Sequence, residues 1–195
     1  MASKADTGPG KLPGARAVPG SAVRRELGLD PGYGRLGLAV VQEQGSRWAL
    51  LGVGCTETPA SEPFEQRLLA LRDTVKELCG RWRPEECALE TLFFSKNAKT
   101  AMRVAEARGV LRLGLAEAGV PVHEIAPNAV KLALAGHGSA PKAQVGRMVV
   151  RLLGLSAIPK PDDAADAAAI ALAGLRSRAL RTFSLGLAAA RGAKP

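Results

Sequence analysis

Short apolar runs alternate with longer segments of helical periodicity along most of the chain. The first three runs, at about residues 25–30, 35–43 and 47–55, are separated by short turns that contain glycine, which predicts three consecutive antiparallel strands. From about 61 to 82 the apolar side chains recur every three or four residues, as they do in a helix that packs on one face. The first half of the chain therefore combines a strand meander with a helix.

The second half alternates shorter strands with helices. Apolar runs that end at Glu90 and Ile125 predict a fourth and a fifth strand. Helical periodicity covers four further segments, at about 97–119, 127–134, 141–153 and 162–175. The first of these helices carries a stripe of small residues, which permits close packing either against the sheet or against a second copy of the chain. The stripe consists of Ala98, Ala101, Ala105 and Gly109.

This order of elements predicts an α/β fold with a mixed five-stranded sheet and helices on both faces. It matches the ribonuclease H-like fold, in which the ends of the first and fourth strands lie side by side. A chain of 195 residues is most simply one such domain with tails. We predict the domain over residues 23–175, after a disordered Gly/Pro-rich extension (1–22) and before a basic C-terminal tail (176–195).

Charge and composition narrow the class of protein. The formal net charge is +9, and the last 20 residues are rich in arginine without an acid, which suits a polyanionic partner or simply aids solubility. No apolar run reaches the roughly 18 residues of a membrane span, so a cytoplasmic, nucleoid-associated protein is expected. The three cysteines have no metal-binding spacing and are expected to be reduced thiols.

Four acidic residues lie where predicted elements begin or end. Asp30 closes the first apolar run just before Pro31-Gly32, and Glu90 closes the fourth. Asp163 and Asp166 lie three residues apart where the last helix opens, and so share one face of it. In the ribonuclease H layout Asp30 and Glu90 meet in the sheet, and the last helix brings the other two acids over them.

Such a cluster of carboxylates requires compensating cations. Two carboxylates about 4 Å apart repel by roughly 4 kcal/mol at an effective dielectric constant near 20. Hard divalent ions such as Mg²⁺ prefer oxygen ligands, and a pair of them can hold both the attacking and the leaving oxygen of a phosphodiester. The acids therefore predict a metal-dependent phosphodiesterase.

Several segments, taken in chain order, resemble a RuvC-type Holliday junction resolvase. The resemblance covers about residues 24–175. The segments that carry it are Leu27–Gly32, Glu90–Phe94, Ala107–Gly109, Val130-Lys131 with Gly136–Val145, and Asp162–Ala167.

The resemblance implies a homodimer that resolves four-way DNA junctions by paired symmetric nicks during recombination and repair, with Mg²⁺ or Mn²⁺ and two ions in each active site. A branch-migration complex of the RuvA and RuvB type is the implied partner. Lys131 and Lys142 match basic positions linked to DNA binding and catalysis, and Phe93 matches an aromatic placed against a base near the junction. The implied catalytic and metal-binding residues are Asp30, Glu90, Asp163 and Asp166.

The chain departs from the family pattern at both tails, which are longer than usual, and in its first strand. There Glu26 occupies a usually apolar position, which predicts an exposed edge or a loosened strand start. Each acid also has an ordinary alternative, such as a turn residue or, for Asp162, a helix cap. A ribonuclease H-like nuclease acting on RNA and a non-catalytic junction-binding module stay open as alternatives. The RNA nuclease could share the four acids but would not need the Lys131 to Lys142 segment or a dimer, whereas the presence of all four acids disfavours the binding module.

Overall fold

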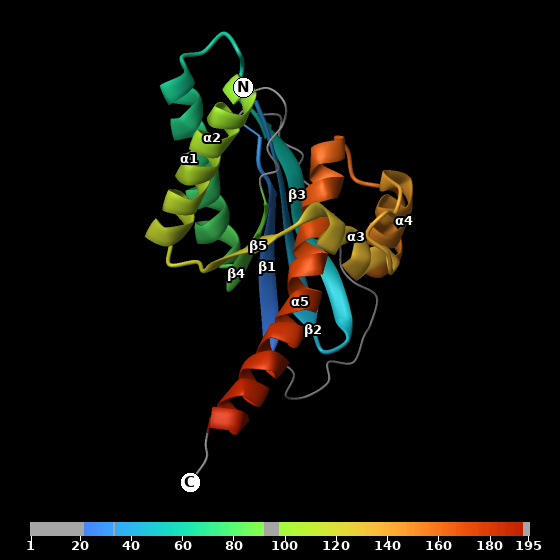
Figure 1. Cartoon of the computed structure of the whole chain (residues 1–195). Helices are drawn as coiled ribbons and strands as arrows, with labels where there is room; N and C mark the ends of the chain where they lie inside the picture. The colour runs from blue at the N-terminus through green and yellow to red at the C-terminus, as the bar shows by residue number, and fades with distance from the viewer. Residues whose placement is uncertain (1–21, 33, 92–97, 193–195) are drawn as a thin grey trace.

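The computed structural model of the protein describes residues 22–32, 34–91 and 98–192. Its centre is one five-stranded sheet in the order β3-β2-β1-β4-β5 (Figure 1). β2 runs antiparallel to β1 and β3, whereas β4 runs parallel to β1 and β5. The strands span Val23–Asp30 (β1), Arg35–Gln44 (β2), Arg47–Glu57 (β3), Glu86–Glu90 (β4) and Val122–Ile125 (β5).

Helices cover both faces of the sheet. α1 and α2 pack on one face, and α3, α4 and α5 lie on the other (Figure 1). The predicted mixed sheet with helices on both faces is therefore confirmed. The helices span Phe64–Trp82 (α1), Ala98–Glu117 (α2), Pro127–Ala135 (α3), Lys142–Leu153 (α4) and Asp162–Gly192 (α5).

Strand alternation divides the core into two halves. Leu27 and Leu29 of β1 are fully buried against the side of α1 and α2, together with Leu71 and Leu111. The opposite half is dominated by the alanines of α5, from Ala164 to Ala173, which are almost entirely buried. Small side chains on α5 allow the helix backbone to approach the sheet closely.

Two glycines on the sheet complete this close approach. A Cβ atom at Gly28 of β1 would lie 2.6 Å from the backbone nitrogen of Ala171, and it would also overlap the carbonyl oxygen of Ala167. A Cβ atom at Gly37 of β2 would overlap the carbonyl oxygen of Asp163. Glycine at these positions therefore sets how near α5 lies to the strands.

Two predicted features differ from the structure in extent or direction. The last helix does not end near residue 175 but continues to Gly192, through most of the predicted C-terminal tail, because no proline interrupts this alanine- and leucine-rich stretch. In the small-residue stripe of α2, Ala105 and Gly109 are exposed while Ala107 and Leu111 beside them are buried, so this part of the stripe does not pack against the sheet, the first of its two predicted partners.

The prediction for Glu26 is wrong. Its side chain is fully buried, and the residue pairs in register with Val41 on one side and Glu86 on the other, so Glu26 lies neither at an exposed edge nor in a loosened part of the strand. The carboxylate points toward α5, where Gly174 leaves room for it. A Cβ atom at Gly174 would lie 2.7 Å from Glu26 Oε1. Glu26 also lies 3.4 Å from His123 Nε2.

The cysteines and the search for membrane-spanning helices complete the description of the fold. All three cysteines are free, and Cys79 and Cys87 are buried as expected for packed thiols. Burial raises the pKa of Cys87 well above its ordinary value. None of the helices in the described part of the chain has the length and apolarity that a membrane span needs.

Candidate active site

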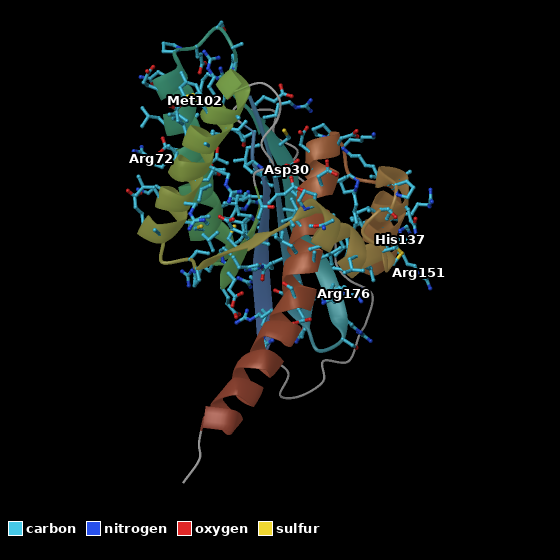
Figure 2. All side chains as sticks on the ribbon, in the orientation of Figure 1. Asp30, Arg72, Met102, His137, Arg151 and Arg176 are labelled. Carbon is cyan, nitrogen blue, oxygen red and sulfur yellow. The ribbon has the colours of Figure 1, made fainter. Side chains whose placement is uncertain are left out.

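The four predicted acids gather at one end of the sheet. β1 and β4 are parallel neighbours with Leu29 opposite Leu89, so the next residues, Asp30 and Glu90, end side by side. Figure 2 shows Asp30 at the end of β1, beside the N-terminal end of α5. That first part of α5 carries Asp163 and Asp166. Three separate chain segments thus supply one acidic cluster, as the sequence predicts.

A cavity of about 200 Å³ opens beside the cluster. Asp30, Glu90 and Asp166 line it together with Lys131 of α3 and Lys142 of α4. Asp163 lies on the other side of the cluster, where Gly37 of β2 meets its backbone. The cavity therefore joins carboxylates with two cationic side chains, which is the combination that an anionic substrate held by cations requires.

Burial and neighbouring carboxylates raise the pKa values of Asp30 and Glu90. Burial, followed by the charges of Asp166 and Asp163, raises the pKa of Asp30 from 3.8 to about 6. Burial and the charge of Asp30 raise the pKa of Glu90 from 4.5 to about 7. Lys142 opposes the effect at Asp30, but its charge is too little to offset it. The protein alone therefore leaves negative charge at this site without full compensation.

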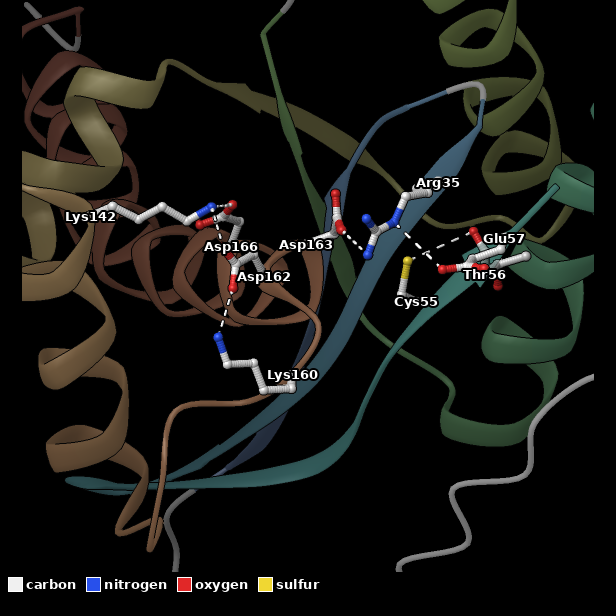
Figure 3. A network of polar contacts seen from close by, with 9 residues as sticks. All are labelled: Arg35, Cys55, Thr56, Glu57, Lys142, Lys160, Asp162, Asp163 and Asp166. Atoms are coloured by element: carbon white, nitrogen blue, oxygen red, sulfur yellow. Dashed lines mark hydrogen bonds and ion pairs between the residues drawn. The ribbon is translucent and has the colours of Figure 1, made fainter. Parts of the chain in front are cut away.

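Cationic side chains flank the two acids of α5 from opposite sides (Figure 3). Lys142, the first residue of α4, donates a hydrogen bond of 2.8 Å to Asp166. Arg35, the first residue of β2, places Nη2 2.9 Å from Asp163 Oδ2. The hydrogen bond to Asp166 raises the pKa of Lys142, so this lysine is cationic near neutral pH.

Asp162 stands apart from this arrangement. It is the first residue of α5, and its carboxylate accepts a hydrogen bond of 3.0 Å from Lys160 and lies 3.7 Å from Lys142. The contact with Lys160 lowers its pKa. Asp162 does not line the cavity beside Asp30, which agrees with its separation from the predicted ligands.

Comparison with known proteins identifies the family. The sequence profile described as crossover junction endodeoxyribonuclease RuvC matches residues 26–174. The crossover junction endodeoxyribonuclease RuvC of Thermotoga maritima is 50% identical over 158 residues, which is 80% of this chain and 94% of that protein. The chain belongs to the RuvC family.

Solved structures agree with this RuvC assignment. Thermus thermophilus RuvC in complex with a Holliday junction substrate is 39% identical, with a TM-score of 0.78 over 82% of this chain and 97% of that one. The yeast mitochondrial Holliday junction resolvase Ydc2 shares the fold. It is 15% identical, with a TM-score of 0.61 over 80% of this chain and 79% of that one. The predicted resemblance, fold and enzyme class, crossover junction endodeoxyribonuclease, are confirmed.

One predicted residue of this RuvC protein, Phe93, lies outside the described residues. Sequence reasoning also missed Arg108 of α2, a buried residue that contacts the strand ends next to the acidic cluster. Arg108 donates to the backbone carbonyl of Glu90 and, at 2.5 Å, to Glu124 of β5. It thereby ties α2 to the ends of β4 and β5. The only sequence signal was its place in the Ala107–Gly109 segment.

A second ionisable cluster was also missed, at the opposite end of β1 and β4. Glu26, Glu86 and His123 offer ligand atoms within 4.8 Å of one another, and the imidazole lies between the two carboxylates. Arg178 of α5 contacts the other oxygen of Glu86 at 3.2 Å. When His123 is protonated, negative and positive groups alternate along the contacts from Glu26 through His123 and Glu86 to Arg178. The cluster therefore links α5 to β1, β4 and β5.

Proposed function

We propose that this RuvC family member resolves four-way DNA junctions by paired, symmetric hydrolysis of two phosphodiesters. The observation that carries the proposal is the convergence of Asp30, Glu90, Asp163 and Asp166 beside a cavity that Lys131 and Lys142 also line. The family assignment supports the substrate class, because a RuvC relative is known in complex with a Holliday junction.

The residues fit a pair of Mg²⁺ or Mn²⁺ ions. All the donors are carboxylate oxygens, and the raised pKa values of Asp30 and Glu90 mark negative charge that divalent cations would neutralise. When bound, such ions supply Lewis acidity that activates water and stabilises the leaving 3′ oxygen. Asp30 and Glu90 would hold ions from the sheet, and Asp163 and Asp166 from α5.

The protein's own cations have a separate role. Lys131 and Lys142 would bind phosphates on either side of the cut and orient the strand across the acids. Each phosphate contact contributes to the salt dependence of binding. Replacing either lysine with methionine is therefore expected to make junction affinity less dependent on salt concentration. We also propose that Phe93 stacks on an unpaired base of the junction.

Paired nicks imply two active sites, which a homodimer would supply. The exposed face of α2 supports this proposal, because Met102, Ala105, Gly109 and Leu113 recur at helical spacing opposite the buried face. The side chains of Met102 and Leu113 are exposed large hydrophobic groups. We further propose, on the family assignment alone, that the protein works in the cytoplasm on nucleoid DNA, beside a branch-migration complex of the RuvA and RuvB type.

The test is a cleavage assay on a synthetic mobile four-way junction, matched duplex and RNA–DNA hybrid, with Mg²⁺ or EDTA and with nicks mapped at nucleotide resolution. Symmetric nicks in the junction alone, and only with metal, are expected. Asp30→Asn and Glu90→Gln should abolish cleavage but retain junction binding. Asp73→Asn, an exposed acid on α1, is the matched control and should cleave normally.

Three results would contradict the proposal. Cleavage of the hybrid in preference to the junction would identify a ribonuclease H-like nuclease acting on RNA. Tight junction binding without metal-dependent nicks would identify a non-catalytic binding module. Full cleavage by the Asp30→Asn variant would remove the assigned role of the acidic cluster.

A further inference from the structure

Arg35 holds an unusual place at the edge of the acidic cluster. It begins β2 just after the turn from β1, and its Nη2 lies 2.9 Å from Asp163 Oδ2 (Figure 3). Its Nε lies 3.7 Å from Glu57 of β3, and a hydrogen bond with Cys55 raises its pKa further. The guanidinium is thus a permanent cation that sits between a proposed metal ligand and the β2–β3 side of the sheet.

The ion pair with Asp163 contributes little to stability. The Arg35 side chain is 48% exposed and that of Asp163 is 28% exposed. Ion pairs with this degree of solvent contact add little to the free energy of folding. The pair also competes with a divalent cation for the same carboxylate. A stabilising role therefore does not explain why a guanidinium is placed at this carboxylate.

The position mirrors that of Lys142. Lys142 contacts Asp166 from α4, and Arg35 contacts Asp163 from β2, so the two cations lie on opposite sides of the acids of α5 (Figure 3). Both side chains are about half exposed. If divalent ions took the place of Arg35 at Asp163, the guanidinium would be free to bind another anion. A guanidinium matches a phosphate with two parallel hydrogen bonds.

We propose that Arg35 is a positioning residue that binds a backbone phosphate of the junction on the β2–β3 side of the acidic cluster, opposite Lys142. The inference rests on the proposed function and adds a DNA contact to it. Arg35 exchanges its contact with Asp163 for the phosphate as the ions and the strand bind. The strand is thereby held from both sides while the carboxylates engage the ions.

The test measures junction affinity against salt concentration by fluorescence anisotropy in Mg²⁺, in a Glu90→Gln background that does not cut the DNA. Loss of one phosphate contact makes the plot of log affinity against log salt shallower by about 0.9. Arg35→Gln should show this change, and Arg35→Lys should restore most of the slope. Arg72→Gln is the matched control, because Arg72 pairs with Asp73 at an exposed site on α1, and it should keep the full slope.

An unchanged slope in Arg35→Gln would overturn the proposal. If that unchanged slope came with a higher Mg²⁺ requirement for cleavage in the otherwise wild-type protein, Arg35 would be shown only to orient Asp163. The Mg²⁺ requirement should not rise, because Arg35 competes with cations for this carboxylate. Failure of the proposed function would appear differently, as a wild-type protein that does not nick the junction.

Discussion

Replacing Asp30 with asparagine should stabilise the metal-free protein. Burial and the neighbouring acids raise the pKa of Asp30 from 3.8 to about 6, so folding disfavours its charged form. One pKa unit corresponds to about 1.4 kcal/mol, which gives an upper bound of about 3 kcal/mol at pH 8. Partial solvent contact reduces this to about 1–2 kcal/mol. For a domain of this size, the gain corresponds to a rise in Tm of about 2–8 °C.

The sign of this effect fixes its pH dependence. Below the unfolded pKa of 3.8 the carboxyl is protonated in both states, so its charge costs the wild-type protein nothing. As pH rises the unfolded state loses its proton first, and the cost accumulates until the folded pKa of about 6 is passed. The charge of Asp30 also raises the pKa of Glu90 to about 7, so this repulsion adds to the cost as Glu90 ionises. The advantage of Asp30→Asn should therefore grow between about pH 4 and 7 and remain constant above that range.

The assay is thermal unfolding in EDTA over this pH range, with the difference in Tm between Asp30→Asn and wild type as the readout. Any pH-independent effect of the substitution cancels from the change in that difference. Asp73→Asn, at an exposed position on α1, provides the matched control and should show a much smaller change with pH. A difference that stays constant with pH, or that falls as pH rises, would refute the electrostatic description of the cluster.

Three further predictions test the ions, the helix position and the second cluster. Millimolar Mg²⁺ should raise the Tm of the wild type at pH 8. Glu90→Gln should lose most of that rise when its Tm is measured by thermal unfolding under the same conditions. Gly37→Ala pushes a Cβ atom into the Asp163 backbone, so its cleavage rate should fall about 100-fold while circular dichroism stays native; unchanged cleavage would contradict the close packing. Glu26→Leu should lower the free energy of unfolding in urea by about 3–5 kcal/mol, because it leaves His123 without this carboxylate. The Glu26→Leu/His123→Phe double variant should recover most of that stability. A double variant that loses the sum of the two single losses would show that the residues are not coupled.

The acids were predictable because their signals are local. Asp30 and Glu90 each end an apolar run, and parallel pairing of their strands follows from the order of elements. Asp163 and Asp166 share a helix face at a spacing that the sequence displays directly. The strands and helices themselves follow from period and turn residues, and most observed bounds agree with the predicted ones to within three residues.

The missed residues depend on contacts between distant segments. Arg108 reaches Glu124 across α2 and β5, and Arg35 reaches Asp163 across more than half of the chain. Glu26 could not be placed correctly from sequence alone, because an isolated acid in a strand predicts exposure. The approach of His123 from β5 helps to make its burial tolerable. Such pairs have no periodic or local signature.

The position of α5 along the sheet connects the two clusters. Near its start α5 carries the acids that meet Asp30, and farther along Gly174 leaves room for Glu26 while Arg178 contacts Glu86. Gly28 fixes the approach between these points, since a side chain there would overlap the helix backbone. A helix held at three places along β1 cannot slide without breaking one of them. The buried charges at the far end therefore help to set where the acids of α5 lie over the strand ends.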